Sequence, residues 1–293
     1  MLPHYGRLDL VQDTVRSVLA QDDPEWRLTV VDDSGDLPDQ GLADWCDSLG
    51  EPRVRYLRND RNLGINRNFQ RCVDLVEHEL AVVIGMDDLV LPGYVGTVRR
   101  AHAAHPGVAM VQPGVEIVDG GGAPARTLVD VAKRWVYAPR VSTPTVLNGE
   151  RLATSLLRGN WLYFPSICWR SEPLRSTGFR EGLSVVQDLA LVIDLVLAGE
   201  SLLVDPTTCF RYRRHGGSVS SAHAADGRRF VEERDFFLSS ADRLTAHGWP
   251  RAARAARRHT ASRLNALIQL PVAARNGERD GVRALARHAF GGR

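Results

Sequence analysis

This sequence of 293 residues lacks any apolar run of the length that crosses a bilayer. A membrane-spanning helix needs ~20 consecutive apolar residues. The longest apolar runs, near residues 80–86 and 189–197, are much shorter. The first residues also lack the basic start and apolar stretch of a secretory signal peptide. We therefore expect a cytoplasmic protein.

Cysteine and lysine are scarce. The sequence has 4 cysteines and no C-x-x-C pair, which argues against a zinc site or a disulfide framework. We expect buried free thiols, because free cysteine behaves as a small apolar residue. Lys133 is the single lysine among 37 basic residues, and arginine is spread over the whole chain. The ratio of arginine to lysine therefore gives no information about the activity of the protein.

Several nucleotide-binding and hydrolytic motifs are also missing. The sequence contains no G-x-G-x-x-G and no G-x-x-x-x-G-K-S/T, which disfavours a dinucleotide-dependent dehydrogenase and a P-loop enzyme. A G-x-S-x-G segment is absent as well, so an α/β-hydrolase is disfavoured. The function has to be sought in other residue patterns.

The composition is that of a globular protein, with 44% hydrophobic and 25% charged residues. Short β-branched runs alternate with amphipathic segments in the first half, which predicts an α/β fold with a mainly parallel sheet flanked by helices. The strands are expected at residues 28–31, 54–57, 80–84 and 201–204, and the helices at 8–20, 42–49, 66–75, 150–157 and 187–198. Beyond residue 227 we expect two or three helices, broken at residues 248–250 and at Pro271.

Two acidic pairs follow predicted buried strands. Asp32 and Asp33 end one strand, and Asp87 and Asp88 follow another. In parallel sheets, ligands bind beyond the carboxyl ends of the strands, so both pairs are expected to face one crevice. Carboxylates that are brought together repel each other unless they share a cation, and hard divalent cations prefer oxygen ligands. Each pair alone has a simpler explanation, because aspartate commonly caps helices and turns.

Six segments in order resemble the family 2 glycosyltransferases, which have the GT-A fold. They are residues 3–7 (P-H-Y-G-R) with 17–21 (S-V-L-A-Q), 30–35 (V-V-D-D-S-G), 62–64 (N-L-G) with 67–68 (R-N), 85–88 (G-M-D-D) with 91–92 (L-P), 187–189 (Q-D-L) and 212–220 (Y-R-R-H-G-G-S-V-S). The resemblance covers about residues 2–221. It implies a Rossmann-like, mixed sheet and a glycosyltransferase activity.

The resemblance also implies a site for a nucleoside-diphosphate sugar of the UDP or dTDP type. Pro3 and Tyr5 would lie at the nucleotide, with the tyrosine ring stacked on the base. Asp33 would bond the base edge with Asp32 beside it, and Arg67 would add contacts to the nucleotide. The acceptor is a hydroxyl compound that the sequence does not identify.

The remaining motifs imply a metal and a base. Asp87 and His215 would hold Mn²⁺ or Mg²⁺, and Asp88 would contact the nucleotide sugar. Asp188 would be the general base of an inverting transfer, removing the proton of the acceptor hydroxyl. Considered alone, Asp188 is also a carboxylate favoured by the dipole at a helix start, and His215 alone reads as a surface histidine.

Three positions depart from the family pattern. Gly85 stands where the family has an aspartate, so metal binding would depend on Asp87 and Asp88. Gln187 replaces a glutamate, which leaves Asp188 as the carboxylate of that pair. Two residues alone precede Pro3, so the first strand is expected to be truncated.

We expect residues 1–221 to form the GT-A domain and residues 222–293 a helical extension. This extension has 14 arginines against 7 acidic residues. Few aromatic residues and no nucleic-acid-binding motif accompany the charge, so no nucleic acid is expected as a partner. A solvated helix face is the first interpretation, and peripheral contact with the inner face of a membrane is the second.

Two other functions stay open. A nucleotidyltransferase of similar sheet would also use paired carboxylates and a metal, but it should carry a glycine-rich basic loop after the first strand, which residues 4–7 do not provide. A non-catalytic protein that binds a sugar nucleotide or a partner is the other alternative. Asp87 and Asp188 argue against it, whereas Gly85 and the short first strand favour it.

Overall fold

The computed structural model describes residues 1–35, 37–38, 40–125, 130, 136–214, 228–276 and 279–291. Its strands are β1 (Leu2–His4), β2 (Leu28–Asp32), β3 (Val54–Arg58), β4 (Leu80–Val82), β5 (Leu89–Val90), β6 (Met110–Asp119), β7 (Thr145–Leu147), β8 (Cys168–Arg170) and β9 (Leu202–Arg214). Its helices are α1 (Leu8–Leu19), α2 (Leu42–Ser48), α3 (Ile65–Asp74), α4 (Tyr94–Ala104), α6 (Gly149–Arg158), α7 (Ser171–Thr177), α8 (Gln187–Leu197), α10 (Arg228–Ala246), α11 (Pro250–Arg258), α12 (Thr260–Arg275) and α13 (Arg279–Phe290).

The sheet is mixed. β1, β2 and β3 pair in parallel in that order. A second group has the order β4-β8-β6-β9-β5, with β7 also on β9, and in it β6 and β9 are parallel while the other pairs are antiparallel. Two backbone contacts of Met1, with Val82 and Ile84, connect β1 to the β4 segment. The α/β architecture expected from the alternating segments is confirmed.

Side chains on the strands alternate between two cores. Val30 belongs to the core under α1 and α4, whereas its neighbour Val31 belongs to the core under α3 and α8. Met110 and Val111 of β6 divide in the same way. Because successive strand residues point to opposite faces, a sheet covered by helices on both faces needs continuous apolar runs. This explains why these strands read as unbroken apolar segments.

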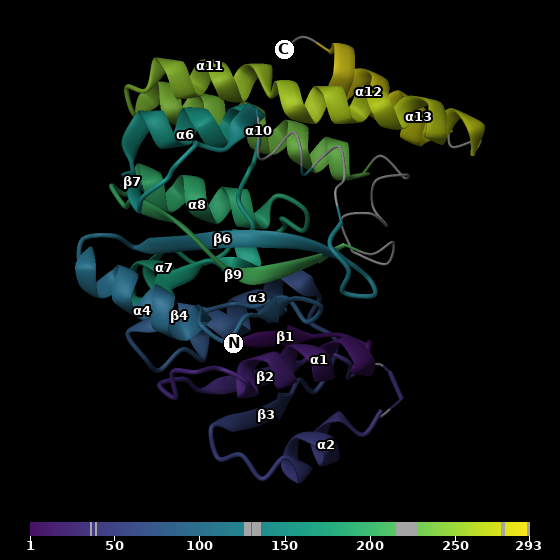
Figure 1. Cartoon of the computed structure of the whole chain (residues 1–293). Coiled ribbons are helices and arrows are strands. Elements are labelled where there is room, and N and C mark those ends of the chain that lie inside the picture. The colour runs from purple at the N-terminus through teal and green to yellow at the C-terminus, as the bar shows by residue number, and fades with distance from the viewer. Residues whose placement is uncertain are drawn as a thin grey trace.

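The carboxyl-terminal helices belong to the same body as the sheet. In Figure 1, α8, α6 and α11 form successive layers above β6 and β9, with α12 and α13 beside them. Phe236 and Phe237 of α10 pack in the core that also contains Leu156 of α6 and Ile193 of α8. The boundary expected between residues 221 and 222 lies outside the described residues.

Three local predictions were wrong. A strand was expected at residues 201–204 alone, but β9 continues to Arg214, because it pairs with β6 as far as Asp119 opposite Arg214. Pro271 was expected to break a helix, but it lies inside α12. We also expected two or three helices at the carboxyl terminus, and the structure has four between Arg228 and Phe290. Among the described residues, no helix is both long and apolar enough to cross a membrane.

Candidate active site

Both carboxylate oxygens of Asp32 have hydrogen-bond partners within the protein. Its Oδ1 accepts the Ser34 amide and lies 2.9 Å from His4 Nδ1, and its Oδ2 accepts the Tyr56 hydroxyl at 2.6 Å. Burial raises the pKa of this carboxyl, but the hydrogen bonds from His4, Tyr56 and Ser34 outweigh that effect and leave the pKa well below its usual value. Asp32 is therefore an anion that fixes the end of β2.

Asp33 joins the end of β2 to the start of α3. Its Oδ1 accepts Asn59 Nδ2 at 2.7 Å and the Leu63 amide at 2.8 Å, and its Oδ2 accepts the Gly64 amide at 2.9 Å. Both oxygens thus organise the turn before α3. This turn presents Arg67, which is exposed on the first turn of the helix.

Pro3 and Tyr5, the two amino-terminal residues expected at the nucleotide, differ in burial. Pro3 is buried in β1 opposite Val31, whereas the side chain of Tyr5 is 45% exposed. The Gly6 amide donates to Ser34 Oγ at 2.9 Å, which attaches this segment to the end of β2. Tyr5 is therefore held at the strand ends with its ring accessible.

Asp88 is buried at the junction of β5 and β9. It is 1% exposed, and its Oδ1 accepts the Arg213 amide at 2.9 Å. Its Oδ2 is buried with no hydrogen-bond partner among the described residues. Burial, and then the negative charge of Asp87, raise the pKa of Asp88 well above its usual value. An orphaned carboxylate oxygen beside a second carboxylate is the environment that a cation would relieve.

The absence of a side chain at Gly85 has a steric explanation. A Cβ at this position would lie 2.5 Å from Asp88 Oδ2 and 3.0 Å from Asp87 Oδ1. Both carboxylates therefore fold back over the Gly85 backbone, and a side chain there would displace them. The departure from the family pattern at Gly85 goes together with this arrangement of Asp87 and Asp88.

Asp188 lies on the first turn of α8 and is partly exposed. Asn160 Nδ2 donates to its Oδ2 at 3.5 Å, and the Leu189 amide donates to its Oδ1 at 2.7 Å. A side chain of the helical extension fixes the backbone that precedes α8. Glu232 Oε1 of α10 accepts hydrogen bonds from the amides of Ser184, Val185 and Val186 at 2.9, 2.7 and 3.0 Å.

The phenol of Tyr212 in β9 is influenced by three carboxylates from different parts of the chain. Burial raises the pKa of its phenol, and the negative charges of Asp88, Asp87 and Asp188 raise it further, against a lowering effect of Arg214. These three carboxylates therefore lie close enough to one hydroxyl group to act on it electrostatically. The expectation that the acidic strand end and Asp188 share a crevice stays a prediction.

Metal binding has a partial structural basis. No group of three or more His, Cys, Asp or Glu side chains suited to a metal occurs in the part of the chain that the structure describes. His215 lies outside that part. Asp87 and Asp88 nevertheless fit a divalent cation, since Mg²⁺ is commonly bound by one or two carboxylates together with substrate phosphates.

Three contributors were missed from the sequence. Asn160 and Glu232 act through the contacts described above. Thr14 of α1 is the third, because its hydroxyl lies 2.9 Å from the Met86 carbonyl and 2.8 Å from the Asp88 carbonyl. No local pattern marks these three residues, because each partner is distant in sequence. Tyr212 lies in the motif at residues 212–220, but the sequence assigned it no role of its own.

The sequence matches the family described as Glycosyl transferase family 2 over residues 1–165. The Mycobacterium tuberculosis (strain CDC 1551 / Oshkosh) protein MT1568, itself uncharacterized, is 27% identical over 245 residues, which is 81% of this chain and 73% of that protein. The putative colanic acid biosynthesis glycosyl transferase WcaA of Escherichia coli (strain K12) is 31% identical over 87 residues, 30% of each chain.

Solved structures share the fold. The crystal structure of S. aureus TarS 1-349 in complex with UDP-GlcNAc has a TM-score of 0.63 at 14% identity, covering 99% of this chain and 91% of that one. The complex of the same protein with UDP has a TM-score of 0.58 at 15% identity, covering 99% and 90%. With the family match spanning more than half of its length, this chain belongs to glycosyl transferase family 2 and is a glycosyltransferase.

Proposed function

We propose that this glycosyltransferase moves a sugar from a nucleoside-diphosphate sugar to an acceptor hydroxyl with inversion at the anomeric carbon. The observation that supports the proposal is that the charges of Asp88, Asp87 and Asp188 all raise the pKa of the Tyr212 phenol. In the proposal, the candidate cation site and the base act on the same bound donor.

The nucleotide would lie over the end of β2. Tyr5 offers an accessible ring for stacking on the base, and Arg67 offers a positive charge at the start of α3. Asp33 still has acceptor capacity, because a carboxylate offers about four lone-pair sites and three hydrogen bonds are made. A uridine diphosphate sugar is the first candidate donor, since the neighbouring TarS structures hold UDP-GlcNAc and UDP.

Asp87 and Asp88 are the residues that would hold Mn²⁺ or Mg²⁺, with His215 as a further ligand. A cation in this position supplies positive charge next to the diphosphate. The residues of the chain have separate tasks: the Arg213 amide holds Asp88, and the hydroxyl of Thr14 holds the backbone on both sides of Asp87.

Asp188 would act as the base. Its carboxylate takes the proton from the acceptor hydroxyl while the acceptor oxygen bonds to the anomeric carbon, and the bond from that carbon to the diphosphate oxygen breaks with its electron pair. Asn160 Nδ2 and the Leu189 amide orient the two oxygens of this partly exposed carboxylate.

We further propose that the protein works in the cytoplasm with peripheral contact to an anionic membrane. Leu264, Leu267, Ile268 and Val272 of α12 are between 38% and 62% exposed and recur on one helix face. Arg254, Arg257 and Arg258 are exposed on the adjoining α11. Apolar side chains bordered by arginines suit the headgroup region of an anionic bilayer.

The transfer proposal is tested by a donor panel. The protein is heated with UDP, dTDP and GDP sugars, each with Mn²⁺ and with chelator, and donor hydrolysis is measured in parallel. A matching donor is expected to raise the melting temperature, with an increase that grows with the logarithm of its concentration relative to Kd, and to be hydrolysed. If no nucleotide sugar stabilises the protein with either addition, the proposed donor site is wrong.

A further inference from the structure

Arg214, the last residue of β9, is held by a buried carboxylate. Its Nη2 donates to Asp130 Oδ1 at 2.7 Å and its Nε donates to Oδ2 at 3.3 Å, and the side chain of Asp130 is only 5% exposed. The hydroxyl of Tyr163 donates to the same Oδ1 at 3.1 Å. Two partners from different elements therefore fix Asp130, and Asp130 in turn fixes the guanidinium of Arg214 at the end of the strand.

The guanidinium also lies against an aromatic ring. Arg214 Cζ is 5.0 Å from the centroid of the Tyr212 ring, which is within the range of a cation–π interaction. The rings of Tyr212 and Tyr163 have centroids 5.2 Å apart. The side chain of Arg214 is thus restricted by a carboxylate and by a ring before any ligand binds, which lowers the entropic cost of binding one.

The strand places Arg214 beside Asp88. β5, which follows Asp88 directly, pairs with β9, and the Arg213 amide donates to Asp88 Oδ1 at 2.9 Å. Arg214 is the next residue along the strand. Burial and then the charge of Asp87 raise the pKa of Asp88, and the positive charges of Arg213 and Arg214 oppose this effect. Arg214 is therefore a fixed cation next to the two carboxylates of the candidate cation site.

Arg214 keeps the capacity to donate to a ligand. A guanidinium has five N–H donors, and in the part of the chain that the structure describes Arg214 makes two hydrogen bonds, both to Asp130. Its side chain is 29% exposed. Arginine is suited to phosphate, because its planar group can give two parallel hydrogen bonds to phosphate oxygens.

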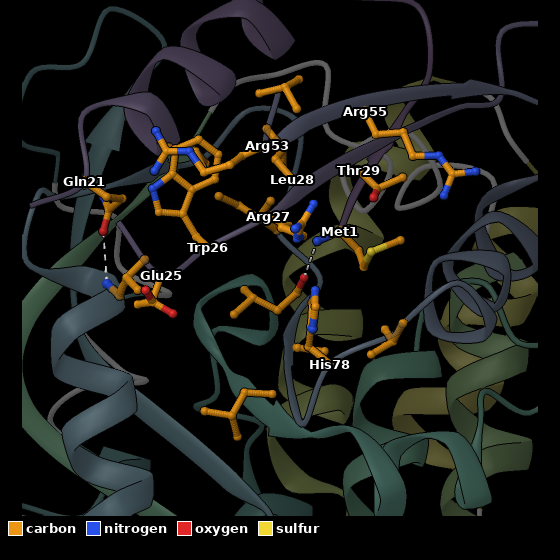
Figure 2. Close-up of a pocket in the computed structure, with 18 of the residues that line it drawn as sticks. Met1, Gln21, Glu25, Trp26, Arg27, Leu28, Thr29, Arg53, Arg55 and His78 are labelled. Atoms are coloured by element: carbon orange, nitrogen blue, oxygen red, sulfur yellow. Dashed lines mark hydrogen bonds between the residues drawn. The ribbon is translucent and has the colours of Figure 1, made fainter. Parts of the chain in front are cut away.

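Arg53 has a similar environment at another place in the fold. Figure 2 shows its guanidinium beside Trp26, with Cζ 4.0 Å from the ring centroid, and its Nε and Nη2 donate to Glu51. Its Nη1 donates to the Pro24 carbonyl at 3.1 Å, so all three nitrogens are bonded within the protein. The cavity of about 1030 Å³ that Arg53 borders is lined by none of the aspartates of the candidate active site. Arg53 is therefore a matched control for Arg214.

We propose that Arg214 binds the diphosphate of the donor, and that Asp130 is the positioning residue that holds Arg214 in place. This inference rests on the proposed function, because a nucleoside diphosphate is the ligand expected beside Asp87 and Asp88. Arg214 would donate to phosphate oxygens on the β9 side of that ligand. A fixed positive charge there also stabilises the negative charge that grows on the diphosphate as its bond to the anomeric carbon breaks.

The test compares the binding of UDP and of uridine, both with Mn²⁺, by titration calorimetry. Arg214→Gln should weaken the binding of UDP at least ~10-fold, because hydrogen bonds to charged groups contribute on that order. The affinity for uridine, which has no phosphate, should not change. Arg214→Lys keeps the charge and should have an intermediate affinity for UDP. Arg53→Gln should bind UDP as the wild type does.

The positioning role of Asp130 is tested by a double variant. Asp130→Asn should weaken UDP binding less than Arg214→Gln does. Asp130→Asn combined with Arg214→Gln should bind UDP no more weakly than Arg214→Gln alone, because Asp130 acts through Arg214. Losses that add would show that Asp130 acts independently, and the positioning role would be wrong.

Three results would overturn the inference. If Arg214→Gln and Arg214→Lys both bind UDP as tightly as the wild type, Arg214 does not contact the diphosphate, and the proposed donor site stands without it. If Arg214→Gln weakens uridine and UDP equally, the substitution disturbs the site as a whole and no phosphate contact is lost. If the wild type itself does not bind UDP, the proposed UDP donor is wrong and the inference fails with it.

Discussion

Asn66 Nδ2 donates a 3.0 Å hydrogen bond to Gln187 Oε1, although 121 residues separate them. The same amide group donates to the Arg180 carbonyl at 3.0 Å. The first turn of α3, which Asp33 organises, is thereby tied to the first turn of α8, which carries Asp188. Gln187 thus serves as an acceptor within the protein, and a carboxylate is not required for that contact.

The base assignment predicts a selective loss of rate. Asp188→Asn keeps the shape of the side chain but removes the proton acceptor, and loss of a general base typically costs ~10²–10⁴ in rate. We expect at least ~100-fold slower transfer with unchanged nucleotide affinity. Transfer assays and calorimetry on the same preparation measure both quantities. Near-normal transfer by the variant would show that another group takes the proton.

The cation assignment predicts a loss of metal-dependent binding. Asp87→Asn should abolish the gain in nucleoside diphosphate affinity that Mn²⁺ confers on the wild type, because a neutral amide is a weaker ligand than a carboxylate. Titration calorimetry with Mn²⁺ and with chelator gives the comparison. Asp74→Asn, at an exposed position on α3, is a matched control. Equal affinity of the wild type with Mn²⁺ and with chelator would refute the assignment.

The contacts of Glu232 predict that the helical extension supports catalysis. Glu232→Ala leaves the amides of Ser184, Val185 and Val186 without their acceptor. Displacement of a catalytic group by ~1 Å can cost ~100-fold in rate, so we expect kcat to fall by ~10- to 100-fold with KM for the donor unchanged. Glu232→Gln, which keeps a carbonyl acceptor, should retain most of the activity.

The control for this prediction is Asp235→Asn, an exposed position on the same helix. It should leave kcat unchanged. If Glu232→Ala and Asp235→Asn behave alike in turnover, Glu232 has no role in positioning Asp188.

Two buried histidines in the extension predict acid sensitivity. Burial, and then the neighbouring His259, lower the pKa of His288 to about 4, from a model-compound value of 6.5. Between these pH values the unfolded chain binds more protons than the folded chain. The free energy of unfolding therefore falls as the pH falls from 6.5 toward 4. We expect His288 to contribute on the order of 3 kcal/mol of this loss.

The measurement is urea unfolding at several pH values. His288→Gln should reduce the slope of stability against pH in this window, whatever its effect at pH 7. His78→Gln, at an exposed position, should leave the slope unchanged. An unchanged slope in His288→Gln would exclude His288 as a source of the acid sensitivity.

The membrane proposal predicts salt-sensitive binding to vesicles. Vesicles with anionic lipid should bind the protein at low salt and release it as the ionic strength rises, because salt screens the arginines. Ile268→Ser together with Leu264→Ser should weaken binding by removing the apolar anchor. Vesicles without anionic lipid are the control. Absence of binding at low salt would leave the arginines as a solvated face.

The positions of most helices and strands in the first two hundred residues follow from local sequence. The apolar positions of residues 8–20 recur on one helix face, and the structure has α1 at Leu8–Leu19. The acidic ends of β2 and β4 could also be located, because a buried run followed by charge marks a strand end. Such features depend on neighbours within a few residues, so the sequence alone determines them.

The environment of each carboxylate was decided by tertiary structure. Asp32 and Asp33 look equivalent in sequence, yet Asp32 is held by His4 and Tyr56 and Asp33 by the turn before α3. Arg213 reaches Asp88 across 125 positions of sequence. Charge, burial and hydrogen bonding depend on which distant segments pack together, and no periodicity in the chain encodes that packing. Only the folded sheet could show which aspartates are partnered, and that Asp88 Oδ2 is buried with no hydrogen-bond partner among the described residues.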